Sequence, residues 1–122
     1  MLLTEDFSVG NYHIIAYDAG SVTINKKLYT ENVIVSPFGL IENWEPKSLE
    51  DIQPEHFCDV LSLNPEVVIL GTGKKCVFLS QEKSKLFLHQ RIGIECMDTG
   101  AACRTYVALV SEGRKTVAAL IL

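Results

Sequence analysis

Hydrophobic and polar residues follow different patterns in the two halves of the chain. The first half, up to about Trp44, consists of short runs rich in β-branched and aromatic residues, separated by turn residues, which is typical of strands. Asp18-Ala19-Gly20 predicts a tight turn, because glycine adopts the positive φ that short hairpin loops require. This half therefore predicts β-hairpins, with strands at Tyr12–Tyr17, Ser21–Asn25, Asn32–Ser36 and, despite the polar pair Glu42-Asn43, Leu40–Trp44.

The second half alternates strand and helix patterns. Val67–Leu70 is a run of four aliphatic residues, as expected of a buried central parallel strand. Further strands are predicted at Val77–Leu79, which is very short, Ile94–Met97 and Thr116–Leu122. Helices are predicted at Pro54–Leu63, at Gln81–Gln90 with Ser80 as its cap and Gly93 at its exit, and from Asp98 as cap to Gly113. This alternation predicts an α/β fold whose sheet is largely parallel and carries packed helices.

Length and composition limit the classes of protein to consider. A chain of 122 residues, 48% hydrophobic and 21% charged, suits one globular domain over residues 1–122. A net charge of -4, without a basic stripe, argues against nucleic-acid binding, which depends on cations that neutralise phosphates. No run of about 20 apolar residues occurs, so we expect no insertion into a membrane.

The four cysteines and the N-terminus indicate the compartment. Cys58, Cys76, Cys96 and Cys103 form no Cys-x-x-Cys pair and lie among apolar neighbours, so we expect free thiols and a reducing environment. The first residues, Met-Leu-Leu-Thr-Glu-Asp, lack the basic start and apolar run of a secretion signal. The expectation is a cytoplasmic protein. The three histidines are scattered, and we predict no metal site and no cofactor.

Two glycine-containing loops are the candidate ligand site. Gly71-Thr72-Gly73 follows the predicted central strand, at the strand end where open α/β sheets bind ligands. Glycine lets backbone amides approach an anion closely, but the motif matches no complete phosphate-binding pattern. The alternative interpretation is a turn without a ligand.

The second loop, Asp98-Thr99-Gly100, precedes the last helix, and Arg104 lies about one turn further on. A cation near a helix N-terminus needs a compensating anion. That anion is either Asp98 or Glu95, a bound ligand, or a protein partner. Cys103 would be a nucleophile only if the helix stabilised its thiolate, and we predict no catalytic residue.

Phe38 and Trp44 are the candidate partner contacts. They lie in Phe38-Gly39-Leu40-Ile41-Glu42-Asn43-Trp44, an apolar stretch without strong periodicity. Aromatic residues often anchor interfaces, yet in a small domain they also cover the core beneath a loop. Both interpretations stay open. The apolar C-terminal strand likewise pairs either within the sheet or across a dimer, which would make a homo-oligomer.

The sequence also resembles a known family. The similarity lies in Pro65-Glu66-Val67-Val68-Ile69-Leu70-Gly71-Thr72-Gly73, then Gly93-Ile94-Glu95, then Met97-Asp98-Thr99-Gly100-Ala101-Ala102-Cys103-Arg104-Thr105-Tyr106, and Ser36-Pro37-Phe38-Gly39 with Trp44. These segments resemble the small α/β domain family that includes mitochondrial respiratory complex I assembly factor 3 and uncharacterised bacterial and archaeal proteins. The resemblance implies a three-layer α/β fold with a central mixed sheet, and it implies no catalytic residues.

Two functional hypotheses follow. The first is a non-enzymatic protein-interaction module that helps to assemble a larger complex, as the resemblance implies for the mitochondrial members. The second is a protein or enzyme that binds a small anionic ligand through the Gly71-Thr72-Gly73 and Asp98-Thr99-Gly100 loops with Arg104. The second requires Gly71, Gly73, Gly100 and Arg104 to meet at one exposed cleft, whereas the first requires an exposed apolar patch.

Overall fold

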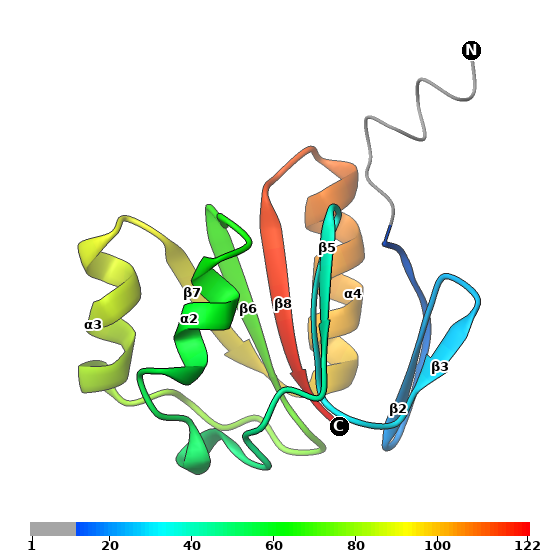
Figure 1. Cartoon of the computed structure of the whole chain (residues 1–122), viewed down its shortest axis with the longest axis horizontal. Helices are drawn as coiled ribbons and strands as arrows, with labels where there is room; N and C mark the ends of the chain where they lie inside the picture. Colours follow the sequence, from blue (N-terminus) through cyan, green and yellow to red (C-terminus); the bar gives the residue numbers. More distant parts are fainter. Residues whose placement is uncertain (1–11) are drawn as a thin grey trace.

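A five-stranded mixed sheet forms the centre of the computed structural model, which describes residues 12–122 (Figure 1). Its strand order is β5-β4-β8-β6-β7. The strands are β4 (Val33–Ser36), β5 (Gly39–Glu42), β6 (Val67–Thr72), β7 (Gly93–Met97) and β8 (Thr116–Ile121). β6 is parallel to β7 and β8, whereas β4 is antiparallel to β5 and β8. The α/β fold with a central mixed sheet is confirmed. Since the C-terminal strand β8 has a neighbour on each side, it pairs within the sheet rather than across a dimer.

A second, three-stranded antiparallel sheet is formed by β1 (Ile14–Asp18), β2 (Ser21–Ile24) and β3 (Lys27–Tyr29). Gly20 has a φ of +84° in the turn between β1 and β2, as the sequence predicts. β3 is not predicted from the sequence, because Lys27 and Leu28 are both exposed and the strand shows no apolar alternation. The first six residues, used above to argue against a secretion signal, lie outside the described residues.

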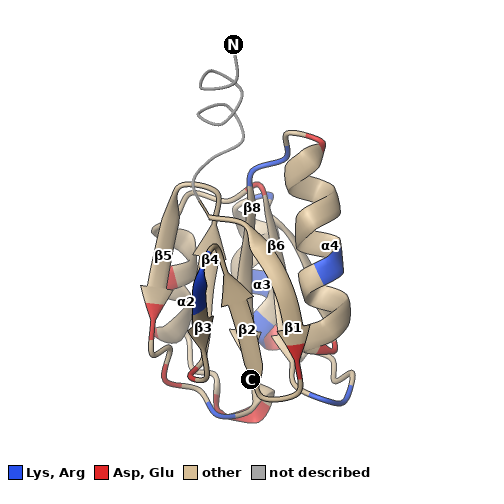
Figure 2. Ribbon diagram, turned by 90° about the vertical axis from the view of Figure 1, so that its right-hand side faces the viewer, with Lys and Arg blue, Asp and Glu red and all other residues tan. Residues whose placement is uncertain are grey.

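The central sheet separates two buried clusters and gives the fold three layers. η1 (Leu49–Asp51), α2 (His56–Leu61) and α3 (Gln81–His89) pack on one face, and α4 (Thr99–Ser111) packs on the other together with β1 and β2 (Figure 1). Alternation along β8 shows how one strand serves both layers: Val117 and Ala119 point to the first cluster, Ala118 and Leu120 to the second. Figure 2 shows that the side formed by β1, β2 and α4 carries few charged residues.

The helix caps agree with the sequence prediction. Ser80 Oγ accepts a hydrogen bond from the amide of Lys83 at 3.3 Å, and Asp98 Oδ1 accepts one from the amide of Ala101 at 2.9 Å. Gly113, with a φ of +82°, follows the end of α4.

Several predicted boundaries are wrong. Gly93 does not end a helix but begins β7, and Arg91 supplies the positive φ after α3. α2 begins only at His56, because the residues after Pro54 form turns first. β6 continues through Gly71 to Thr72. Residues 77–79 form no strand, and within residues 12–122 β7 pairs only with β6.

Candidate functional site: a groove between β1 and α4

The two predicted ligand loops lie against each other. Thr99 is fully buried, and its hydroxyl accepts a hydrogen bond from the amide of Gly73 at 2.8 Å and donates one to the carbonyl of Ile121 at 2.7 Å. The amide of Thr99 donates back to the carbonyl of Gly73 at 2.9 Å. The sequence predicts that backbone amides of these loops bind an anion. In the structure, the amides of Gly73 and Thr99 already donate hydrogen bonds within the protein. Anion binding by these loops stays a prediction.

Gly71 has a packing role at this junction. It lies inside β6, and a Cβ built on it would be 2.9 Å from Thr99 Oγ1 and 3.1 Å from Thr99 Cα. Such distances leave no space for a side chain, so glycine here lets the start of α4 approach the sheet. Thr72, the last residue of β6, has its hydroxyl 3.1 Å from the carbonyl of Met97 on β7. The junction thus holds the N-terminus of α4 at a fixed place on the sheet.

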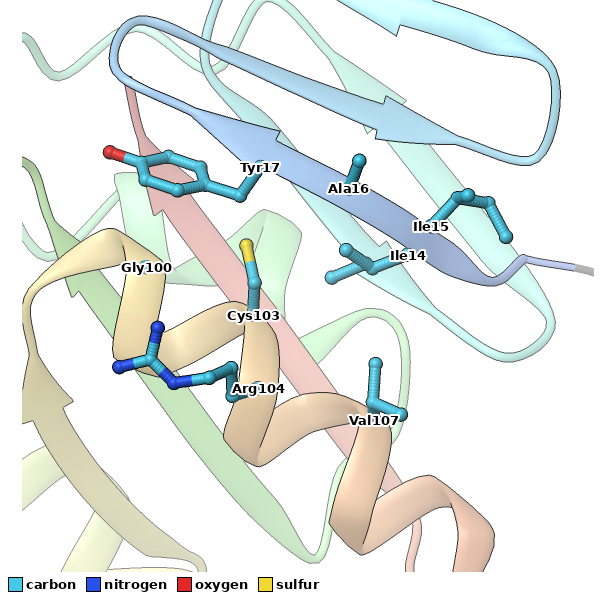
Figure 3. Close-up of a pocket in the computed structure, with 8 residues that line it drawn as sticks. All are labelled: Ile14, Ile15, Ala16, Tyr17, Gly100, Cys103, Arg104 and Val107. Carbon is cyan, nitrogen blue, oxygen red and sulfur yellow. The ribbon is translucent and has the colours of Figure 1, made fainter.

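An open groove of about 460 Å³ runs between β1 and α4 (Figure 3). Its walls are apolar for most of their length, and the lining residues are Ile14, Ile15, Ala16 and Tyr17 from β1 with Gly100, Cys103, Arg104 and Val107 from α4. Of the residues predicted as ligand contacts, Gly100 and Arg104 line this groove, whereas Gly71 and Gly73 do not. The predicted set is therefore divided between a structural junction and a surface groove.

A bulge in β1 shapes one wall. The pairing register with β2 shifts between Ile14, opposite Ile24, and Ala16, opposite Thr23, so Ile15 is an extra residue. Ile14 is buried in the core beside α4, while Ile15 is 64% exposed. On the facing wall, a Cβ on Gly100 would be 3.3 Å from the ring of Tyr17. Glycine at this position lets the β1 strand approach the first turn of α4.

The groove carries one positive charge at neutral pH. Among its described lining residues, Arg104 alone has a charged side chain, and within residues 12–122 it forms no ion pair with Asp98, Glu95 or another carboxylate. Burial raises the pKa of Cys103 to about 11, an effect that the nearby Arg104 only partly opposes. Burial, followed by the charges of Cys103, Asp98 and Asp18, raises the pKa of Tyr17. The Cys103 thiol therefore stays protonated and is a poor nucleophile.

Comparison with known proteins places the chain in a family. Residues 14–121 match the family described as "Protein of unknown function (DUF498/DUF598)". The chain belongs to this family. The match covers every strand and helix described above, including both walls of the groove.

Relatives of this DUF498/DUF598 domain include proteins named as assembly factors. The rat protein named NADH dehydrogenase [ubiquinone] 1 alpha subcomplex assembly factor 3 is 34% identical, and the alignment covers 98% of this chain and 65% of the rat protein. The chain thus spans less than two thirds of that relative's length. The resemblance inferred from the sequence motifs is confirmed.

Solved structures show the same DUF498/DUF598 fold. A crystal structure from Bordetella parapertussis has a TM-score of 0.85 and 32% identity, covering 91% of this chain and 95% of that one. An NMR structure from Xanthomonas campestris has a TM-score of 0.83 and 37% identity, covering 99% and 92% of the two chains.

The two aromatic residues predicted as partner contacts have different environments in this DUF498/DUF598 fold. Trp44 is 4% exposed, packs in the core beside α2 and donates from Nε1 to the carbonyl of His56 at 3.2 Å. Its ring therefore presents almost no surface to a partner. Phe38 is 69% exposed in the turn between β4 and β5, and its contact with a partner stays a prediction.

The β1 wall of the groove is not predicted from the sequence. Ile14–Tyr17 reads as an ordinary strand, and nothing in its spacing signals the bulge that exposes Ile15.

Among residues 12–122, no cluster of three His, Cys, Asp or Glu side chains is arranged to hold a metal ion. The helices in that same part of the chain are too short or too polar to cross a membrane.

Proposed function

We propose that this chain is a non-enzymatic protein-interaction module that helps to assemble or stabilise a larger complex. The observation that supports it most directly is the apolar groove between β1 and α4, where Ile15 is 64% and Val107 48% exposed. Exposed apolar side chains that line one groove together with an arginine are typical of a protein interface. The relatives named as complex assembly factors support the same proposal.

The proposed partner is a protein that covers the groove. Burial of the Ile15 and Val107 side chains would supply apolar contact, and a carboxylate of the partner would pair with Arg104. We propose the cytoplasm as the compartment, because all four cysteines are free thiols, which suits a reducing environment.

Affinity purification with matched surface variants tests this proposal. The tagged chain is purified from its native host as wild type, as Ile15→Asp/Val107→Asp, and as Leu88→Asp. Leu88 is 63% exposed on α3, on the other side of the central sheet, so it controls for the loss of one exposed apolar residue. We expect a defined partner to be enriched with wild type and Leu88→Asp, and at least tenfold less with the groove variant.

Two outcomes would count against the proposal at different levels. If no protein is enriched above a tag-only sample, the interaction module itself is not supported. If a partner is enriched equally by the groove variant, the module stands but its contact surface lies elsewhere, and Phe38→Asp becomes the variant to test.

The alternative proposal is binding of a small anion by the groove. It is supported by Arg104, which is exposed on α4 one turn after Gly100 and has no carboxylate partner within the described residues. Thermal unfolding in the presence of phosphates, nucleotides and carboxylates tests it, with Arg104→Ala as the variant and Lys85→Ala as the control. An anion that raises the midpoint of wild type and Lys85→Ala, but not of Arg104→Ala, would support this function. If no anion raises the midpoint of thermal unfolding, the result would contradict this function.

A further inference from the structure

Cys76 lies close to the backbone of Cys96 where the segment after β6 passes the edge of the central sheet. Cys76 is exposed in that segment, and Cys96 is half-buried on β7. The Sγ atom of Cys76 lies 4.0 Å from the carbonyl oxygen of Cys96. β7 is the last strand in the sheet order, so no other strand separates the two residues.

Hydrogen bonds hold the segment at this place. The Thr72 hydroxyl contacts the carbonyls of Lys75 and Met97 and accepts from the amide of Val77 at 3.3 Å. A single side chain at the end of β6 thus ties the residues on both sides of Cys76 to the residue after Cys96. The backbone of Leu79 in turn hydrogen-bonds to the Cys96 thiol. The proximity of the two cysteines is therefore built into the fold.

The other two cysteines lie elsewhere. Cys58 is exposed on α2, and Cys103 is buried on α4, which packs on the opposite face of the sheet from α2 and α3. In the sequence, 20 positions separate Cys76 from Cys96, and this spacing gives no redox motif. The path of the chain around Thr72 places the Cys76 thiol beside the backbone of Cys96.

We propose that Cys76 and Cys96 form an intramolecular disulfide when the protein meets a small disulfide oxidant such as oxidised glutathione. The Cys76 thiolate attacks one sulfur of the oxidant, forming a mixed disulfide and releasing one glutathione thiolate. The Cys96 thiolate then attacks the Cys76 sulfur and releases the second glutathione. Two protein thiols are oxidised, one glutathione disulfide is reduced to two thiols, and the protein's two protons pass to the departing thiolates.

The order of the two steps follows from exposure. Burial raises the pKa of Cys96, and the hydrogen bond from the Leu79 backbone only partly opposes this effect, so the Cys96 thiol is the slower nucleophile and acts second. The exposed Cys76 is the thiol that oxidised glutathione reaches first. A disulfide needs Cα atoms roughly 4.4–6.8 Å apart. Residues 76–80 belong to no helix or strand, so any adjustment is local to this segment.

Peptide mapping of the full-length chain tests the proposal. The protein is incubated with oxidised glutathione, free thiols are blocked with N-ethylmaleimide, and the chain is digested without reduction. Trypsin leaves Cys96 and Cys103 in one peptide, residues 92–104, so a second cleavage before Asp98 is needed to separate them. We expect a fragment linking Cys76 to Cys96 and the loss of two blockable thiols per chain.

Three single variants complete the design. Cys76→Ser should abolish the linked fragment, and Cys58→Ser, which removes an exposed cysteine elsewhere, should leave it unchanged. Cys96→Ser should accumulate glutathione on Cys76. The proposal is overturned if Cys76 links to Cys58, to Cys103 or to a second chain. It is also overturned if wild-type Cys76 keeps its glutathione while Cys96 stays blockable.

Discussion

Thr99 and Gly73 are joined by two hydrogen bonds that run in opposite directions. The Gly73 amide donates to the Thr99 hydroxyl at 2.8 Å, and the Thr99 amide donates to the Gly73 carbonyl at 2.9 Å. The same hydroxyl donates to Ile121 at the end of β8. One buried side chain therefore links the turn after β6, the end of β8 and the first residue of α4. Because α4 forms a wall of the groove, this junction also positions the candidate site.

Replacing Thr99 by valine should destabilise the fold. Valine keeps the shape but removes the hydroxyl, which leaves the Gly73 amide and the Ile121 carbonyl without their partner. Unsatisfied polar groups of this kind cost about 1–3 kcal/mol. Urea unfolding should show this loss for Thr99→Val and a smaller one for Thr99→Ser. Thr105→Val is a control on the same helix, because the Thr105 hydroxyl contacts only the weak acceptor Met97 Sδ among its described hydrogen bonds. Equal stability of Thr99→Val and wild type would contradict this account of the junction.

Gly71→Ala should also be destabilising, by roughly 1–3 kcal/mol for an overpacked site. The new Cβ would lie 2.9 Å from Thr99 Oγ1 and 3.1 Å from both Thr99 Cα and Leu120 Cδ2. Gly93→Ala, in the neighbouring strand, is the matched control, since its Cβ would find its nearest neighbour at 3.6 Å. Denaturation midpoints of the two variants should separate clearly. A small loss for both would mean that α4 moves away from the sheet without difficulty.

The sequence predicts the buried strands and helix caps of this fold better than its exposed strands. Val67–Leu70, the Asp98 cap and the apolar C-terminal strand are recognisable, because burial on both faces and helix capping leave local signals. β3 is different, since Lys27–Tyr29 is exposed and is defined only by its pairing with β2. Pairing between two segments leaves no pattern within the sequence of either one. The sequence therefore predicts only part of the three-stranded sheet.

Some residues of the candidate site are likewise predictable from the sequence, and others are not. Gly100 and Arg104 are recognisable from the sequence, because they follow a predicted strand end and a cation near a helix N-terminus needs a compensating anion. The β1 wall was missed, because the bulge at Ile15 depends on the register against β2. The glycines after β6 suggest a ligand loop, yet Gly71 is needed to accommodate Thr99, which comes 28 positions later in the chain. A close approach between distant segments is visible only in the folded structure.

Glu66 should make a pH-dependent contribution to stability. A hydrogen bond from Arg114 Nε at 2.8 Å, with further help from the Lys115 amide at 3.1 Å, lowers the pKa of the Glu66 carboxyl. A lowered pKa in the folded state means that the stabilisation is present above the ordinary pKa of about 4.3. It is lost as the pH falls through the folded-state value. The difference in unfolding free energy between wild type and Glu66→Gln should therefore be constant at neutral pH and shrink on acidification.

Urea unfolding between neutral and acid pH measures that difference. Glu112→Gln, on an exposed residue with no ion pair within residues 12–122, is the control and should follow wild type at every pH. A gap between wild type and Glu66→Gln that widens on acidification would have the opposite sign and would contradict the assignment.

Cys103 should react slowly with alkylating agents in the native protein. Burial raises its pKa to about 11, so its thiolate fraction at neutral pH is roughly two orders of magnitude below that of an ordinary exposed thiol. Timed alkylation with iodoacetamide, followed by mass spectrometry of each cysteine, should modify exposed Cys58 early and Cys103 last. Unfolding in urea should remove the difference between the two residues, which separates the effect of burial from that of the neighbouring sequence. Rapid native alkylation of Cys103 at neutral pH would show instead that Arg104 and the start of α4 stabilise its thiolate, and would reopen the question of a nucleophile in the groove.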